Sequence, residues 1–254
     1  MADVLPRTPP KNVGTSNAYQ EVPMIHANCR MRLTADDFTF VVKVLSRSET
    51  DHVSLVKLLV DEDTRDAILD HDLLAKAILE SPQRLPISPQ LLFYVLCRKV
   101  LRETPVKSRE AADFVASVLE GFMRTARMEA SDETGTRSLQ YLSDIMHAMN
   151  NAGTREAFLL RSHAANYALF ISGIFADNVE MRTRQRGAPD LSFYEAVGQM
   201  NYRAASEYRE AKRFKLQSIY EELAGGFREV RLALNDLASR LLHLDTPSTL
   251  IIAT

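Results

Sequence analysis

The chain contains little glycine and no tryptophan. Nine of its 254 residues are Gly, and none of them has the Gly-x-Gly spacing that opens a nucleotide-binding loop. So few glycines also leave few positions for the left-handed turns that connect strands in sandwiches and barrels. The sequence therefore disfavours a Rossmann or P-loop enzyme and an all-β fold.

Cysteine is equally scarce, and long apolar runs are missing. Cys29 and Cys97 are the only cysteines, which excludes a disulfide framework or a zinc cluster built from cysteine alone. The longest apolar run, residues 164–176, is too short to cross a bilayer. Residues 1–6 lack the basic and apolar regions of a secretory signal. We therefore expect a cytoplasmic protein that does not enter a membrane.

The net charge is small but unevenly distributed. The formal charge of −2 provides no overall attraction to nucleic acid or anionic lipid. Residues 49–80 hold nine acidic and three basic residues, a net charge of −6, whereas residues 161–215 hold nine basic and six acidic residues, a net charge of +3. This polarity indicates a docking surface.

Hydrophobic periodicity predicts an all-α fold, a multi-helix bundle of roughly ten helices. Residues 1–33 have four prolines and no apolar period, which is typical of an extended or disordered arm. We expect an N-terminal helical lobe at 34–130 and a C-terminal helical lobe at 136–243, as one continuous domain or two packed ones. A tail follows at 244–254.

Several helix ends have local signals. Thr34 and Asp37 form a capping-box pattern, and Ser88 precedes Pro89 as an N-cap precedes the first helical residue. The polar segment 182–189 is predicted to be a loop. The last helix carries a heptad-like seam that favours self-association. The residues of this seam are Phe227, Val230, Leu234, Leu237 and Leu241.

The helix predicted at residues 154–175 is apolar nearly all round, as expected for the centre of a bundle. Polar groups on such a helix require partners. Ser162, His163 and Asn166 lie three or four residues apart, and Arg161 precedes them, so the four side chains can converge. The favoured interpretation is a satisfied hydrogen-bond network in the core, and the alternative is a ligand-binding pocket.

A helix with two distinct faces is predicted after Pro189. Its core stripe comprises Phe193, Val197, Met200, Ala204, Tyr208 and Ala211. The opposite face, with one exposed tyrosine, is interpreted as solvated or as a surface for a protein partner. The candidate residues of this interaction surface are Arg182, Arg184, Arg186, Glu195, Gln199, Tyr202 and Arg209.

The basic residues between positions 182 and 215 also suggest nucleic-acid binding, since cations with nearby aromatic rings can hold phosphates and stacked bases. Interleaved glutamates cancel much of this charge. A helical surface covered by salt bridges is therefore the favoured interpretation.

His71 and Asp72 form an adjacent pair that can ligate one metal ion when another His and Asp complete the shell. The upstream candidates are His26 and His52, and the downstream ones are Asp113 and Asp144. This order is similar to that of the HD-type phosphohydrolases, which are all-helical. The resemblance implies a metal-activated water that attacks a phosphoester.

The chain departs from that family after the pair, where Leu74, Ala75 and Lys76 replace a frequent Gly-Lys. The favoured interpretation of His71 and Asp72 is a solvated helix start, and a metal site formed with Asp144 is the alternative.

No cofactor is expected. The sequence favours a non-enzymatic interaction or regulatory module that binds a protein partner or a second copy of itself. A metal-dependent phosphohydrolase of HD-like type is the alternative function, and nucleic-acid binding is the third.

Overall fold

The computed structural model describes residues 24–81, 85–129 and 137–244, which contain thirteen α-helices, one 3-10 turn and no strand. The predicted all-α fold is confirmed, with more helices than the ten expected. The N-terminal elements are η1 (Arg30–Arg32), α1 (Ala35–Leu45), α2 (Glu49–Leu58), α3 (Glu62–Leu69), α4 (Asp72–Leu79), α5 (Pro89–Leu101) and α6 (Arg109–Glu129). The remaining helices are α7 (Arg137–Met149), α8 (Thr154–Ile174), α9 (Ala176–Arg186), α10 (Leu191–Ser206), α11 (Arg209–Arg213), α12 (Gln217–Gly225) and α13 (Phe227–Leu244).

The local signals at the helix starts are confirmed. The Thr34 hydroxyl accepts the backbone N–H of Asp37, whose carboxylate accepts the backbone N–H of Thr34 in return. The Ser88 hydroxyl caps α5, with Pro89 in the first turn. Asp37 also accepts the Ser88 N–H and hydroxyl at 2.7 Å each, so one buried carboxylate joins the starts of α1 and α5.

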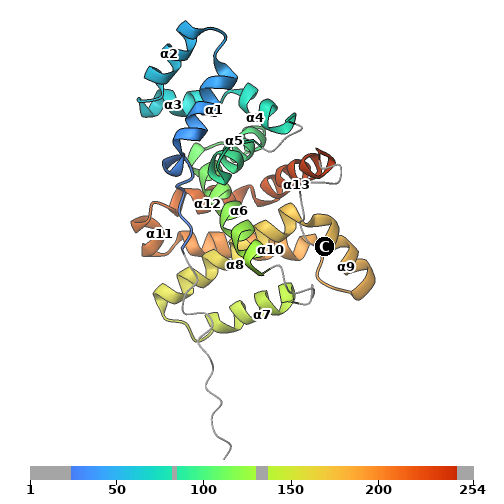
Figure 1. Ribbon diagram of the computed structural model, residues 1–254. Helices are drawn as coiled ribbons and strands as arrows, with labels where there is room; N and C mark the ends of the chain where they lie inside the picture. The colour runs from blue at the N-terminus through green and yellow to red at the C-terminus, as the bar shows by residue number, and fades with distance from the viewer. Residues whose placement is uncertain (1–23, 82–84, 130–136, 245–254) are drawn as a thin grey trace, which may run out of the picture.

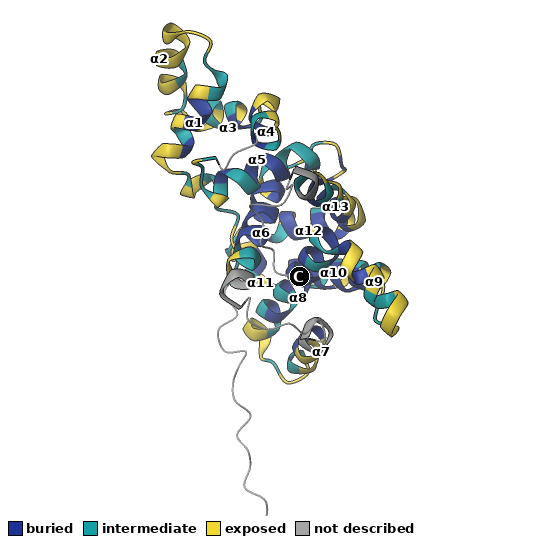
Figure 2. Ribbon diagram, turned by 45° about the vertical axis from the view of Figure 1, so that its right-hand side comes forward, coloured by how far each residue is buried: buried dark blue, intermediate teal, exposed yellow. Residues whose placement is uncertain are grey.

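Helix α8 lies at the centre of the molecule, as its all-round apolar sequence predicts (Figure 1). It packs mainly against α10, with α13 and α7 on other sides. The buried hydrophobic residues form one continuous core from Cys29 to Leu237, which includes side chains of both predicted lobes. Figure 2 shows this buried centre, with the exposed residues concentrated at its two ends.

The prediction of a loop at 182–189 is wrong for residues 182–186, because they belong to α9. Gly187 ends this helix with φ of +62°, a conformation that glycine adopts without strain. Only Ala176 and Val179 of α9 are buried, so the helix has no apolar stripe that periodicity could detect. The helix predicted over residues 191–212 is also divided, into α10 and α11.

The seam of the last helix packs inside the molecule. Phe227, Val230 and Leu234 are completely buried, and α13 uses this side to contact α8 and α5. The predicted seam is therefore part of the core, and it does not provide a surface for self-association.

The predicted arm is structured at its end. Residues 1–23 lie outside the described residues, but residues 24–33 pack on the body of the protein, and Cys29 is completely buried. Across the described residues, no helix is both long and apolar enough to cross a membrane.

Gly198 on α10 allows a close approach that α10 and α13 require. A Cβ atom at this position would lie 2.1 Å from the ring of the fully buried Phe227. We predict that Gly198→Ala lowers the free energy of unfolding by about 1–3 kcal/mol, because overpacking outweighs the better helix propensity of alanine.

The matched control is Gly225→Ala, whose Cβ would meet nothing within 4 Å. Its stability in urea unfolding should stay within about 0.5 kcal/mol of the wild type. Equal stability of both variants would show that the ring contact imposes no constraint.

Candidate functional site

The polar side chains of α8 bind partners within the core. Asn166, which is 3% exposed, accepts a hydrogen bond of 2.7 Å from the Tyr202 hydroxyl. The Ser162 hydroxyl donates to the Phe158 carbonyl at 2.9 Å and is hydrogen-bonded with the buried Tyr220. Burial raises the pKa of Tyr220 to about 12.

Arg161 extends in a different direction from these residues. Its guanidinium donates to Asn201 Oδ1 and to the Tyr208 hydroxyl, both at 3.3 Å. The four candidate ligand-binding side chains on α8 therefore contact separate partners and do not converge on one site. The contacts match the interpretation of a satisfied core network.

His163 stacks against Phe122 with ring centroids 5.5 Å apart. Burial lowers the pKa of His163 to about 4, so the imidazole is neutral at pH 7. It supplies an aromatic contact between α6 and α8, and its charge state depends on the packing around it.

The buried face of α10 is not the one predicted from the sequence. Tyr202, expected on the surface, is completely buried, and burial raises its pKa well above the usual value. Met200, expected in the core, is 53% exposed. Many residues on the buried side are small or polar, so they do not contribute to a pattern of large apolar side chains. These residues are Gly198, Asn201, Ala205 and Ser206, together with Tyr194, Val197 and Tyr202.

The remaining surface candidates lie in different surroundings. Glu195 forms an ion pair of 2.7 Å with Arg231, and both side chains are largely buried. Gln199 is partly exposed, whereas Arg209 is exposed on α11. Tyr202 is therefore not part of the predicted interaction surface. The carboxylate of Glu195 is already paired with Arg231 inside the protein.

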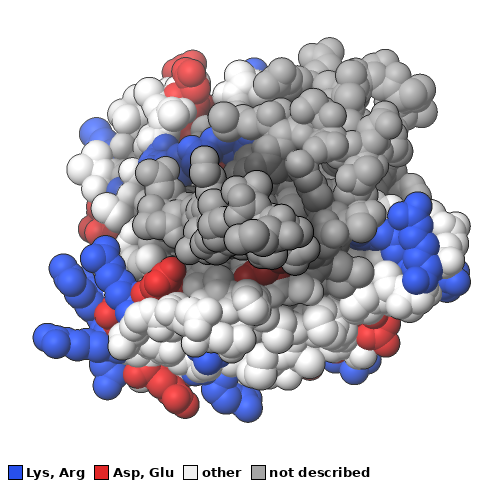
Figure 3. Space-filling view, turned by 90° about the horizontal axis from the view of Figure 1, so that it is seen from below, with Lys and Arg blue, Asp and Glu red and all other residues white. Residues whose placement is uncertain are grey.

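The basic residues do not gather in one patch. Arg184 pairs with Glu180 at 2.7 Å, and Arg182 donates to the Asn178 carbonyl at 3.2 Å. Helices α9 and α11 lie on opposite sides of the molecule (Figure 1). Seen from below, Lys and Arg side chains appear at both edges of the face, with acidic side chains among those on the left (Figure 3). Among the described residues, the cations of α9 and α11 therefore lie apart and do not form one continuous track for a phosphate backbone.

His71 and Asp72 lie at the start of α4, in agreement with the favoured interpretation of a solvated helix start. The Nδ1 atom of His71 accepts the Leu73 N–H at 3.2 Å, and Asp72 pairs with Lys99 and Arg102 on α5. Hydrogen bonds from these two cations lower the pKa of Asp72.

Asp144 is exposed on α7, at the opposite end of the molecule from α4 (Figure 1). Of the other proposed ligands, His26 packs edge-on against Phe214, and Asp113 binds Arg30. No group of three His, Cys, Asp or Glu side chains within the described ranges is arranged to hold a metal ion. The ligand set of the HD-like alternative is therefore not brought together.

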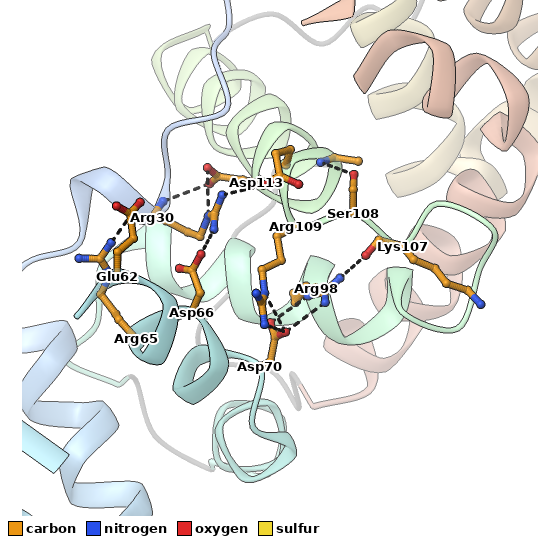
Figure 4. Close-up of polar contacts among 12 residues, drawn as sticks. Arg30, Glu62, Arg65, Asp66, Asp70, Arg98, Lys107, Ser108, Arg109 and Asp113 are labelled. Atoms are coloured by element: carbon orange, nitrogen blue, oxygen red, sulfur yellow. Dashed lines mark hydrogen bonds and ion pairs between the residues drawn. The ribbon is translucent and has the colours of Figure 1, made fainter. Parts of the chain in front are cut away.

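A cluster of buried charges that sequence reasoning missed lies where residues 24–33 meet α3, α5 and α6 (Figure 4). Arg30, whose side chain is 15% exposed, forms ion pairs with Asp66 and Asp113 and lies over the ring of Tyr94. Its backbone N–H also donates to Asp113 at 3.1 Å. Burial raises the pKa of Asp113, and Arg30 opposes this effect. Arg30 attaches the segment to the helices.

A second part of the cluster attaches α3 to α5 and α6. Asp70 receives hydrogen bonds from Arg98 at 2.9 and 3.0 Å and from Arg109 at 3.1 Å (Figure 4). Burial alone would raise the pKa of Asp70, but the two guanidinium groups lower it overall. The cationic and anionic side chains of the cluster pair with one another. The cluster therefore holds residues 24–33, α3, α5 and α6 together.

The exposed apolar residues are concentrated on and directly after α2. Val53, Val56 and Leu58 are 53%, 49% and 47% exposed, and Val60 is 83% exposed. No residue of α2 is buried. Val53 and Val56 lie one turn apart on α2 and Val60 follows the helix, so these apolar side chains face solvent together.

Comparison with protein-family models, with curated proteins and with solved structures finds no match to this chain. Its function must therefore be argued from its own residues.

Removing Arg30 tests the buried cluster. We predict that Arg30→Ala lowers the free energy of unfolding by about 3–5 kcal/mol, because Asp66 and Asp113 would stay buried without their cation. In the control Arg240→Ala, a 62% exposed side chain loses one pair with Asp236, which is itself 56% exposed, and the loss should not exceed about 1 kcal/mol. Similar losses in urea unfolding of the two variants would contradict the assigned role.

The lowered pKa of His163 predicts a pH dependence of stability. Between pH 6.5 and pH 4 the unfolded chain binds a proton at this imidazole that the folded protein excludes, so stability falls as the pH drops through this window. His163→Gln should lose about 2 kcal/mol less than the wild type between pH 7 and pH 5. The control His147→Gln, at an exposed position, should keep the wild-type slope. Parallel wild-type and His163→Gln curves would refute this assignment.

Proposed function

We propose that the protein is a non-enzymatic interaction module that self-associates, with the α2 end of one copy binding the α9 end of another. The observation that carries this proposal is the unburied apolar side of α2. A ten-residue helix gains little stability by itself in water. Covering Val53, Val56 and Val60 would remove apolar area that the single chain leaves in solvent, at roughly 25 cal/mol for each Å².

The charges around α2 favour a basic counterpart. Glu49 and Asp51 are exposed in the first turn of α2, and Glu62 and Asp63 are exposed in the first turn of α3. Lys57 and Arg47, just before α2, are exposed cations nearby, so acidic residues outnumber them. A binding surface for α2 should therefore combine apolar area with Lys or Arg.

Helix α9 of the same chain has these properties. Met181 is 47% exposed, and Arg184 and Arg186 are exposed in the last turns of α9. Arg184 also pairs with Glu180 of its own helix, so an acidic partner would exchange with Glu180 at this cation. The two helices project from different ends of the molecule, so they cannot cover each other within one chain (Figures 1 and 2). The contact joins two different surfaces and leaves one of each free, so copies add head to tail.

We further propose a cytoplasmic location. Cys29 and Cys97 are both free and completely buried. Burial raises the pKa of each thiol, and unpaired cysteines are typical of reducing compartments.

Sedimentation of the purified protein tests self-association. The wild type should gain mass above 28.6 kDa as its concentration rises, and added salt should reverse this gain. Val53→Glu with Val56→Glu should remain monomeric, because it adds acidic charge to the apolar side. The control is Met200→Glu with Met146→Glu, two positions of similar exposure on other helices, and it should associate like the wild type.

A mixing experiment identifies the second surface. Arg184→Glu with Arg186→Glu should also be monomeric alone. An equimolar mixture with the α2 variant should form dimers and nothing larger, because each variant contributes one intact surface. A wild type that stays monomeric at all concentrations, or variants of α2 that associate normally, would refute the proposal.

A further inference from the structure

Two adjacent hollows lie along α13 and form one groove, which we call the α13 groove. The first, about 330 Å³, lies between α13 and the end of α5, and the second, about 320 Å³, lies between α13, α4 and α5. Both are lined by Lys99, Val100 and Arg240. The groove therefore follows α13 along much of its length.

The groove has an exposed apolar side chain in each hollow. Leu232 in the first is 48% exposed, and Leu73 in the second is 40% exposed. Val100, Ala233 and Leu237 add further apolar lining. Such a lining suits aliphatic side chains.

Most charges at the rim of the groove are paired, but carboxylates outnumber cations, because Lys99 is shared by Asp72 and Glu103 and because Glu229 is a further exposed carboxylate. Lys76 pairs with Glu80 at 3.9 Å, Lys99 with Asp72 at 3.2 Å, and Arg240 with Asp236 at 2.8 Å. An anionic or cationic occupant would have to compete with these pairs. The excess of carboxylates disfavours an anionic occupant, so a segment without acidic side chains suits the groove.

The chain itself contains a segment of this kind close by. Residues 246–254 carry no charged side chain and include three consecutive aliphatic residues, Leu250, Ile251 and Ile252. These residues lie outside the described part of the chain, which ends at Leu244 of α13, four residues after Arg240 in the groove.

The linking segment is long enough to reach the groove. Six residues from Leu244 to Leu250 span up to about 20 Å when extended. On α13, Leu232 lies 12 residues before Leu244, a distance of about 18 Å along the helix. The aliphatic residues can therefore reach Leu73 and Leu232 if the chain turns back along α13.

We propose that Leu250, Ile251 and Ile252 bind in the α13 groove of their own chain and cover Leu73 and Leu232. The attachment to α13 keeps the segment at an effective concentration in the millimolar range, which favours the same chain over a second copy. This inference is independent of the proposed contact between α2 and α9.

Disulfide trapping in the full chain tests the proposal. Ile251→Cys is combined with Leu232→Cys or, separately, with Leu73→Cys, and a mild oxidant is added. Cys29 and Cys97 do not compete, because both are completely buried. We expect at least one pair to form an intramolecular disulfide about tenfold faster than the control pair of Ile251→Cys with Met146→Cys on α7, which is 41% exposed.

Equal trapping rates for groove and control positions would overturn the proposal. Disulfide-linked dimers in place of intramolecular bonds would overturn it too, because the segment would then bind a second copy.

Hydrogen exchange supplies a readout without new cysteines. The triple variant Leu250→Ser, Ile251→Ser and Ile252→Ser should exchange faster than the wild type around Leu232 in α13. Thr246→Ser with Thr249→Ser should leave that exchange unchanged. No difference between the triple variant and the wild type would count against the docked segment.

Discussion

The fold depends on the burial of α8. A helix surrounded by other helices must satisfy each of its polar side chains inside the protein. Asn166 therefore needs Tyr202, Ser162 is bonded with Tyr220, and Arg161 reaches Asn201 and Tyr208. These partners come from α10 to α12, so the polar bonds set the rotation of the neighbouring helices around α8. An apolar core alone would leave that rotation weakly specified.

The parts of the fold that were predicted from sequence depend on neighbouring residues. Thr34 and Asp37, or Ser88 and Pro89, act across three residues or fewer, so their pattern is complete in a short window. The centre of the bundle was also predictable, because residues 154–174 are apolar on every side. Satisfaction of the polar groups of α8 inside the core followed from the same burial.

The errors have a common physical origin in contacts between distant residues. Tyr202 is buried because Gly198, four residues before it, lets Phe227 approach α10 closely, and periodicity counted Met200 as core in its place. Helix α9 buries only Ala176 and Val179, which are too few to form an apolar stripe that periodicity could detect. The cluster around Arg30 joins residues 36 and 83 positions apart, so no local pattern marks it. The exposure of Val53 and Val56 on α2 was not predictable either.

The ion pairs of Arg30 with Asp66 and Asp113 also determine when residues 24–33 can pack on the helices during synthesis. Asp113 follows Arg30 by 83 residues, and a ribosome that adds about 5–20 residues per second needs roughly 4–17 seconds to make them. Residues 24–33 are thus translated before their binding surface on α6, which emerges later. During this delay Cys29 lacks Ser117 of α6, which it contacts at 3.4 Å in the folded protein, so its full burial has to wait for α6.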